Sequence, residues 1–172
     1  MATKTVFRPM LESDWEMVVD IYKQGIATGN ATFQQDAPTW TEWNDSHLKT
    51  CRIVAITEGV VAGWVALTAV SGRCVYAGVA EVSVYVGDKF KGQKLGSLLL
   101  EKLISESEKD GLWTLQAGIF KENEPSIKLH EKHGFRQIGY REKIGKMNGI
   151  WRDTLLFERR SKNIGVDKRH ID

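Results

Sequence analysis

The hydrophobic pattern is most regular between residues 80 and 104. Valines first alternate with Glu81, Ser83 and Tyr85, and this period of two is typical of a strand. Leucines then recur at helical spacing, which predicts a helix that packs one side against a sheet. A glycine- and lysine-rich loop, residues 87–94, joins the two. Because such a loop directs backbone N–H groups and the positive end of the helix dipole at one point, it favours an anion.

Apolar runs elsewhere predict the remaining elements. Three more helices are expected: one opened by a capping box between Ser13 and Glu16, one after Pro38, and a short one late in the chain. Gly63 and Gly78 interrupt apolar runs, which indicates bulges or close contacts. The order predicts an α/β (α+β) fold, with a mixed sheet of about seven strands flanked by about four helices. The other strands are expected over residues 5–8, 52–57, 60–70, 113–119, 135–144 and 150–158.

Length and composition fit one compact domain. The chain has 172 residues, of which 42% are hydrophobic, so we expect a single domain over residues 1–160 and a polar, disordered tail over residues 161–172. The formal charge of +2 is too small to indicate nucleic-acid binding, and no apolar run suits a signal peptide or a membrane span. Cys51 and Cys74 have neither metal-ligand nor C-x-x-C spacing. We therefore expect a cytoplasmic protein that binds no metal, nucleic acid or membrane.

Two segments form a motif. The first runs from Lys91 to Gly96 and matches neither the G-x-x-x-x-G-K-[ST] loop nor a dinucleotide-binding pattern. The second, N-E-P-S-I-K-L-H-E-K-H-G-F, runs from Asn123 to Phe135. Together they resemble the GCN5-related N-acetyltransferase family, whose segments read Gln/Arg-x-x-Gly-x-Gly/Ala and Asn-x-x-Ser-x-x-Leu-(Tyr/His)-x-x-x-Gly-Phe. The second segment matches throughout. In the first, Lys91 stands at the Gln/Arg position and Lys94 replaces the middle glycine.

The resemblance implies acetyl-coenzyme A as co-substrate. It also implies a fold in which the strand with Glu81 splays from a parallel neighbour, so that the pantetheine arm bonds to the free strand edge as an added peptide strand would. For Asn123 a plain helix cap is the alternative explanation. The implied coenzyme-binding residues are Val84, Tyr85 and Val86 on the strand, Lys91, Gly92, Gln93, Lys94, Leu95, Gly96 and Ser97 at the pyrophosphate, and Asn123 and Ser126 near the pantetheine.

The run Arg73-x-x-Tyr76-x-x-x-x-Glu81-x-Ser83-x-Tyr85 is similar to one branch of this family, the phosphinothricin and methionine sulfoximine acetyltransferases. Enzymes of this branch acetylate the α-amine of small amino-acid analogues, and the similarity extends over nearly the whole chain. It therefore implies a small-molecule amine substrate and a homodimer. The implied substrate-binding residues are Phe33, Arg73, Tyr76, Glu81 and Ser83, and Trp151 and Asp153 are implied to support the dimer.

The chemistry requires a base, because an amine is mostly protonated in water and only its neutral form attacks a thioester. The resemblance assigns this role to Glu81, although a strand glutamate also often faces solvent or pairs with an arginine. His130 would protonate the leaving thiolate or relay a proton, or it is an ordinary helix histidine. A backbone N–H near Val84 would stabilise the oxyanion. Arg73 would bind the substrate carboxylate, unless it is a solvated surface charge.

Three functions stay open. The first, which we favour, is acetyl transfer to a small amino-acid analogue. The second is acetyl transfer to a polyamine, an aminoglycoside or a protein N-terminus, for which an acidic pocket would be better suited than one with Arg73. The third is a non-catalytic acyl-coenzyme A sensor, which would need the loop at Lys91 but not Glu81. The presence of both Glu81 and His130 favours catalysis.

Overall fold

The computed structural model describes residues 4–167. One sheet of 7 strands, in the order β1-β2-β3-β4-β5-β7-β6, is accompanied by four α-helices and short 3₁₀ turns. This is the mixed fold that the sequence predicts. The strands are β1 Thr5–Pro9, β2 Ile53–Thr57, β3 Val60–Ala69, β4 Val79–Val86, β5 Thr114–Phe120, β6 Arg136–Met147 and β7 Ile150–Arg160, and the helices are α1 Trp15–Ala27, α2 Trp40–Ser46, α3 Leu95–Lys109 and α4 Glu124–Lys132.

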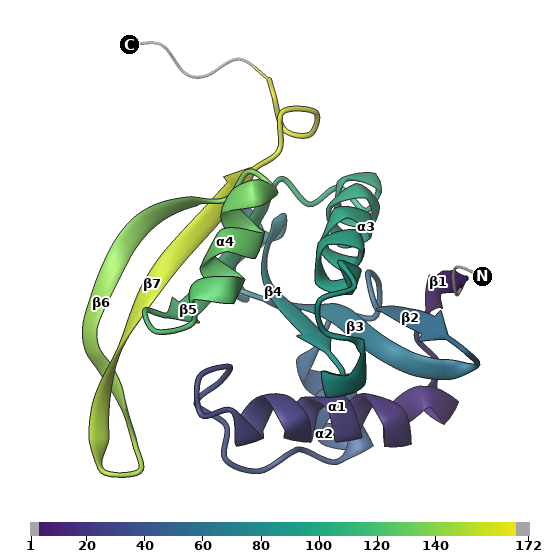
Figure 1. Ribbon diagram of the computed structural model, residues 1–172. Coiled ribbons are helices and arrows are strands. Elements are labelled where there is room, and N and C mark those ends of the chain that lie inside the picture. The colour runs from purple at the N-terminus through teal and green to yellow at the C-terminus, as the bar shows by residue number, and fades with distance from the viewer. Residues whose placement is uncertain (1–3, 168–172) are drawn as a thin grey trace, which may run out of the picture.

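Helices cover both faces of the sheet (Figure 1). α3 and α4 pack on one face and α1 and α2 on the other, so there are two hydrophobic cores. Along β3, Val65 and Leu67 belong to the first core, whereas Trp64 and Ala66 belong to the second. This follows from the alternation of side chains along a strand. β6 and β7 form a long curved hairpin at one edge (Figure 1).

Among the strands that the structure describes, only β4 and β5 pair in parallel, and their pairing is short. It consists of Val79 with Thr114, Ala80 with Leu115, and Glu81 with Gln116. Beyond these pairs β4 stays with β3, and β5 stays with β7, so the sheet divides (Figure 1). We call the gap between residues 82–86 of β4 and 117–120 of β5 the fork. The splayed strands agree with the fold that the family resemblance implies.

The closed end of the fork is packed around Gly78. The backbone N–H groups of Trp113 and Thr114 both donate to the Gly78 carbonyl, at 2.9 and 3.1 Å. A Cβ atom added to Gly78 would lie 2.0 Å from the nearest atom of the Trp113 ring. The close contact predicted at Gly78 is therefore confirmed, and only glycine leaves room for the indole.

The irregularity predicted at Gly63 is also confirmed. Ala55 pairs with Gly63 and Ile56 with Val61, which leaves Ala62 as the extra residue of a bulge. A Cβ atom on Gly63 would lie 2.9 Å from the Tyr85 carbonyl oxygen. Both the bulge and the close contact thus fall where glycine interrupts the apolar run.

The start of α1 differs from the prediction. The helix begins at Trp15 after a 3₁₀ turn, η1 Glu12–Asp14, so the predicted capping box between Ser13 and Glu16 is wrong. The carboxylate of Asp14 instead accepts hydrogen bonds from the Leu11 N–H, at 2.8 Å, and from both terminal nitrogens of Arg8, each at 2.7 Å. These bonds hold the pKa of Asp14 below its usual value. The two hydrogen bonds between Asp14 and the Arg8 guanidinium join charged groups, and such bonds are stronger than the neutral hydrogen bond of a serine cap.

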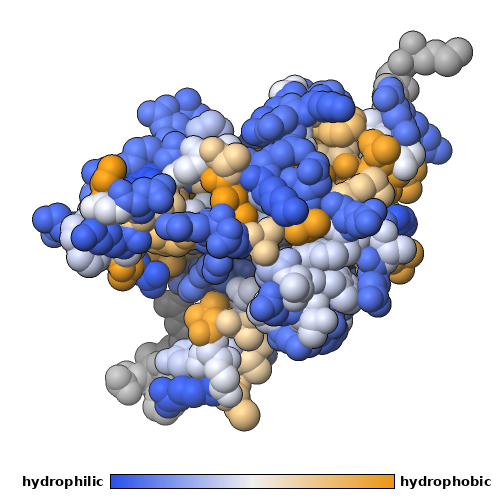
Figure 2. Space-filling view, turned by 90° about the horizontal axis from the view of Figure 1, so that it is seen from below, coloured by the Kyte–Doolittle hydropathy of each residue, from blue (hydrophilic) through white to orange (hydrophobic). Residues whose placement is uncertain are grey.

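The surface seen from below is mostly hydrophilic, with several separate hydrophobic patches, some of them on the side of the β6–β7 hairpin (Figure 2). Exposed apolar residues of the hairpin include Ile144, Ile150 and Trp151. Among the residues that the structure describes, no helix is long and apolar enough to cross a membrane.

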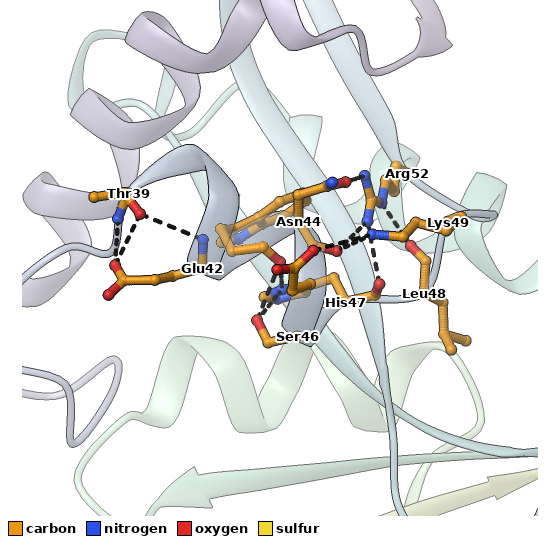
Figure 3. A network of polar contacts seen from close by, with 10 residues as sticks. Thr39, Glu42, Asn44, Ser46, His47, Leu48, Lys49 and Arg52 are labelled. Carbon is orange, nitrogen blue, oxygen red and sulfur yellow. Dashed lines mark hydrogen bonds and ion pairs between the residues drawn. The ribbon is translucent and has the colours of Figure 1, made fainter.

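Polar contacts fix both ends of α2 (Figure 3). At its start the Thr39 hydroxyl accepts from the Glu42 N–H at 3.3 Å, while the Glu42 carboxylate accepts from the Thr39 N–H at 2.8 Å, which is a capping box. Near its end Arg52 donates to the side-chain oxygen and the carbonyl of Asn44, at 2.7 and 3.0 Å. The guanidinium also lies 5.0 Å from the centre of the Trp43 ring. Arg52 thereby connects the end of this helix to the second core.

The first residues of the predicted disordered tail contact α3. The Ser161 hydroxyl and the Asn163 amide donate to the carboxylate of Glu108, at 2.8 and 2.9 Å. Arg159 forms an ion pair with the same carboxylate, at 3.2 Å. The disorder predicted from residue 161 therefore does not extend to these residues, and residues 168–172 lie outside the described part of the chain.

Replacement of Gly78 should destabilise the fold. In Gly78→Ala the new methyl group overlaps the Trp113 ring, so we expect urea unfolding to show a loss of about 1–3 kcal/mol. Gly72→Ala is the matched control, because no atom lies within 4 Å of the Cβ position there. It should change stability by less than about 0.5 kcal/mol. Equal losses in both variants would contradict the close packing at the end of the fork.

Candidate active site

The edge of β4 that faces the fork presents backbone groups to it. The N–H of Gly87 donates to the Ala62 carbonyl on β3, at 2.8 Å. Because the backbone groups of an antiparallel strand alternate in direction, those of Val82, Val84 and Val86 point away from β3 and into the fork. These donors and acceptors match the needs of a ligand that carries amide groups.

A cavity of about 870 Å³ occupies the fork. β4 and β5 form its base, residues 28–34 one wall and α4 another, and residues of β6 and β7 close the far side. Among residues 4–167, no cluster of His, Cys, Asp and Glu side chains is suited to hold a metal ion. The predicted site residues that line the cavity are Phe33, Glu81, Ser83, Val84, Tyr85, Val86, Lys91, Gly96, Asn123, Ser126 and His130.

Glu81 occupies the last paired position before β4 and β5 separate. Its half-buried carboxylate lines the cavity and accepts a hydrogen bond from the Gln116 amide at 3.1 Å. Gln116 is also its partner across the strand pair, so the two side chains lie on the same face. The contact orients one carboxylate oxygen toward Gln116 and leaves further acceptor sites of the carboxylate for a group in the cavity.

His130 is buried on α4, with 4% of its surface exposed. Its Nδ1 lies 2.7 Å from the Ser126 carbonyl oxygen. A carbonyl only accepts, so Nδ1 bears the proton and Nε2 is left as an acceptor. Nε2 is buried and has no hydrogen-bond partner among the described residues. Burial also holds the pKa of His130 below its usual value, and the neutral ring can therefore take up a proton but has none to donate from Nε2.

The loop before α3 has the shape of an anion-binding turn. Gly92 and Lys94 both adopt left-handed backbone angles, with φ of 78° and 63°. Lys94, the residue that replaces the family's middle glycine, thus takes the conformation that a glycine adopts easily, at a cost of about 1–2 kcal/mol. The side chain of Leu95 is in the core, at 3% exposure, so only its backbone N–H could face a ligand. Lys91 lines the cavity, whereas Gly92, Gln93, Lys94, Leu95 and Ser97 lie beside it.

Arg73 and Tyr76 lie outside the cavity. Both are exposed, and the Arg73 guanidinium lies 5.7 Å from the centre of the Tyr76 ring. They belong to the segment that precedes β4, where the short turn η2 Cys74–Tyr76 is found. The structure therefore does not bring these two residues to the other predicted substrate-binding residues.

Residues 28–34 form a wall that the sequence did not predict beyond Phe33. Arg152 of β7 donates to the Gly29 carbonyl at 2.9 Å and to the Asn30 side chain at 2.8 Å. The Asn123 amide donates to the Asn30 carbonyl at 3.0 Å. The Asn123 side chain also caps α4, since its oxygen accepts from the Ser126 N–H at 3.3 Å. The helix cap expected as an alternative role of Asn123 is therefore present, and the same side chain also bonds to the wall at Asn30.

A distortion in β6 brings Arg141 to the cavity. Arg141 pairs with Thr154 and Gly145 with Arg152, so three residues of β6 lie opposite one residue of β7.

The β7 residue opposite this bulge is Asp153. Its carboxylate accepts hydrogen bonds from the Lys143 N–H at 2.7 Å and from Lys121 at 3.0 Å. These contacts and the Tyr140 hydroxyl hold the pKa of Asp153 well below its usual range. The side chain of Asp153, which was expected to support a dimer, therefore has hydrogen-bond partners within its own chain. No sequence pattern marks Arg141, which within residues 4–167 is the one arginine that lines the cavity.

A family model for the acetyltransferase (GNAT) family matches residues 15–135. The match includes β4, the loop before α3, and α4, which together form the base and one wall of the cavity. The chain belongs to the GNAT family of acetyltransferases. It is an N-acetyltransferase of the branch that resembles phosphinothricin acetyltransferases.

Two relatives illustrate this branch. The phosphinothricin N-acetyltransferase of Streptomyces viridochromogenes is 32% identical over 157 residues, which cover 88% of this chain and 85% of the relative. The L-methionine sulfoximine/L-methionine sulfone acetyltransferase of Pseudomonas aeruginosa is 38% identical over 83 residues, which cover 48% of each chain.

A solved structure shares the fold. It is the crystal structure of a GNAT superfamily phosphinothricin acetyltransferase from Sinorhizobium meliloti in complex with AcCoA. The TM-score is 0.85 and the identity 25%, with 98% of this chain and 93% of the other covered.

Proposed function

We propose that this N-acetyltransferase transfers the acetyl group of acetyl-coenzyme A to the α-amine of a small amino-acid analogue, of the phosphinothricin, methionine sulfoximine or methionine sulfone type. The observation that supports this most directly is one cavity that contains Glu81, the open edge of β4, and Arg141. The names of the two relatives and the AcCoA complex of the solved neighbour agree with this substrate class and this co-substrate.

The coenzyme would extend along the fork. In this proposal its pantetheine amides bond to the backbone of Val84 and Val86, and its pyrophosphate lies against the N-terminus of α3. There the first backbone N–H groups of the helix, together with Lys91, favour negative charge. Asn123 and Ser126 would border the pantetheine from the other wall. The thioester would then lie between the strand edge and α4.

The transfer would be direct. Glu81 takes a proton from the substrate ammonium, so that the neutral nitrogen attacks the thioester carbonyl and forms the C–N bond. The Val84 N–H stabilises the oxyanion of the tetrahedral intermediate. Nε2 of His130, an acceptor at rest, takes the second proton from that nitrogen and passes it to the sulfur as the C–S bond breaks. His130 is thus a relay in our proposal and not a resting acid, because its resting Nε2 bears no proton.

For substrate capture we propose Arg141 in place of Arg73. A guanidinium binds a planar carboxylate with two hydrogen bonds. Arg141 is exposed but lines the cavity, whereas Arg73 lies outside it. Phe33 would limit the pocket, because its ring packs on Phe120 at 4.7 Å between centroids. Ser83 lines the cavity next to Glu81 and would complete the substrate contacts.

We also propose a homodimer in the cytoplasm. The hairpin of β6 and β7 exposes the large side chains of Ile144, Ile150 and Trp151, and a group of exposed apolar residues is typical of subunit interfaces. The two cysteines are free, which fits a reducing compartment. A single-chain mass in sedimentation equilibrium would contradict the dimer.

The function is tested by thiol release from acetyl-coenzyme A. Purified protein is assayed with phosphinothricin, methionine sulfoximine, methionine sulfone, common amino acids, spermidine and an aminoglycoside. We expect turnover with the amino-acid analogues alone. Turnover only with the polycations would replace this substrate class by another amine, and coenzyme binding without any turnover would indicate an acyl-coenzyme A sensor.

Loss of the proposed base should reduce turnover. Glu81→Gln keeps the shape of the side chain and its contact with Gln116 but cannot take a proton, so kcat should fall by about a hundredfold or more. Coenzyme affinity, measured by calorimetry, should not change. Glu122→Gln is the control, since Glu122 is a second carboxylate of the cavity that is paired with Arg152 at 3.2 Å. Equal turnover in Glu81→Gln and wild type would exclude Glu81 as the general base.

The two arginines give opposite expectations. Arg141→Ala should raise KM for the amino-acid analogue by about tenfold or more, the usual effect of losing a hydrogen bond between charged groups. Arg73→Ala should leave KM near the wild-type value, because its guanidinium is outside the cavity. Steady-state kinetics at saturating acetyl-coenzyme A measures both. The reverse result would indicate that Arg73, and not Arg141, binds the carboxylate of the substrate.

A further inference from the structure

A hydrogen bond connects the loop before α3 with the end of α4. The Ser97 hydroxyl, in the first turn of α3, lies 2.7 Å from Nε2 of His133, the residue that follows α4. Both side chains are half-buried. The two helices are close here, since a Cβ atom on Gly96 would lie 3.5 Å from the Leu129 side chain. The contact therefore joins a residue of the pyrophosphate loop to a titratable ring outside the cavity.

The direction of this bond determines what Ser97 can do. A serine hydroxyl has one proton and two acceptor positions. If Nε2 of His133 has no proton, the Ser97 hydroxyl donates to it and presents only lone pairs elsewhere. If Nε2 bears a proton, it donates to the hydroxyl oxygen, and the Ser97 proton is free to bond to an anion. A phosphate oxygen beside Ser97 would therefore favour a protonated Nε2.

The surroundings of His133 favour the neutral form of its ring. Burial lowers the pKa of His133, and the positive charges of Lys132 and Arg159 lower it further, while Glu101 on α3 acts in the opposite direction. His130 lies one turn earlier on α4, and its own pKa is lowered in part by His133. A diphosphate at the N-terminus of α3 would add negative charge on the Ser97 side and favour the imidazolium.

We propose that His133 is a positioning residue for the coenzyme pyrophosphate: it takes up a proton when the coenzyme binds and, through Nε2, turns the Ser97 hydroxyl toward a phosphate oxygen. This inference rests on the proposed function, because it takes acetyl-coenzyme A as the co-substrate. His133 itself does not touch the reacting atoms.

Proton uptake by His133 determines how the affinity for the coenzyme changes with pH. The pKa of His133 is higher in the complex than in the free protein, so coenzyme binding is strongest below the free value. It weakens as pH rises through the bound value, by about tenfold for each unit that separates the two values. The chemical step, which depends on Glu81 and His130, has no part in this change.

Calorimetry of coenzyme A binding to the full chain tests the proposal. Titrations near neutral pH in two buffers of different ionisation enthalpy should show net proton uptake, and affinity should fall as the pH is raised above neutrality. In His133→Leu we expect binding about three- to tenfold weaker at the lower pH, with neither proton uptake nor this pH dependence. His133→Gln, whose amide can donate at every pH, should bind more tightly than His133→Leu and take up no proton.

Acetylated pantetheine, which has no pyrophosphate, is the control substrate to compare with acetyl-coenzyme A. Wild type and both His133 variants should use it with equal kcat/KM, whereas a merely structural role of His133 would affect both ligands. No proton uptake by wild type, or an unchanged pH dependence in His133→Leu, would overturn the inference and leave the proposed function standing. A wild-type protein that binds no coenzyme A would overturn the proposed function itself and this inference with it.

Discussion

The short pairing between β4 and β5 is the constraint on which the rest of the structure depends. Parallel neighbours usually satisfy each other's backbone groups, but here the ladder ends at Glu81 and Gln116. The fork cannot close without other losses, because β4 is fully paired with β3 on one side and β5 with β7 on the other. The backbone beyond the branch point therefore remains available to a ligand, and the carboxylate of Glu81, at the last pair, lies next to that backbone.

The two histidines at the end of α4 differ in what each ring nitrogen meets. His130 Nδ1 faces the Ser126 carbonyl, which only accepts, so the position of its proton is fixed. His133 Nε2 faces a hydroxyl, which can donate or accept, so the contact is possible whether or not Nε2 bears a proton. One residue type, placed once on the helix and once directly after it, thus gives one fixed acceptor and one adjustable contact.

The parts predicted correctly from the sequence are those specified by neighbouring residues. β2, β3, α3 and α4 follow local periodicity and caps. The two short motifs correctly indicated the family, and the coenzyme contacts that they imply stay a prediction. The parts that were missed depend on distant partners. Asp14 bonds to Arg8 and not in a helix cap, the wall at Asn30 depends on Arg152, and Arg141 reaches the cavity through a bulge that no local pattern marks. Arg73 was assigned by resemblance alone, and its placement depends on tertiary structure.

The bulge in β6 has a consequence for how this scaffold changes over evolution. It lies beside the cavity, where the Lys143 N–H donates to Asp153, while the fork and the loop before α3 are built from other segments. Inserting or deleting a residue in the bulge would shift Arg141 and Ile144 without altering a single pair between β4 and β5. An insertion or deletion in this bulge is therefore a change by which the pocket near Arg141 can vary while the fork keeps its shape.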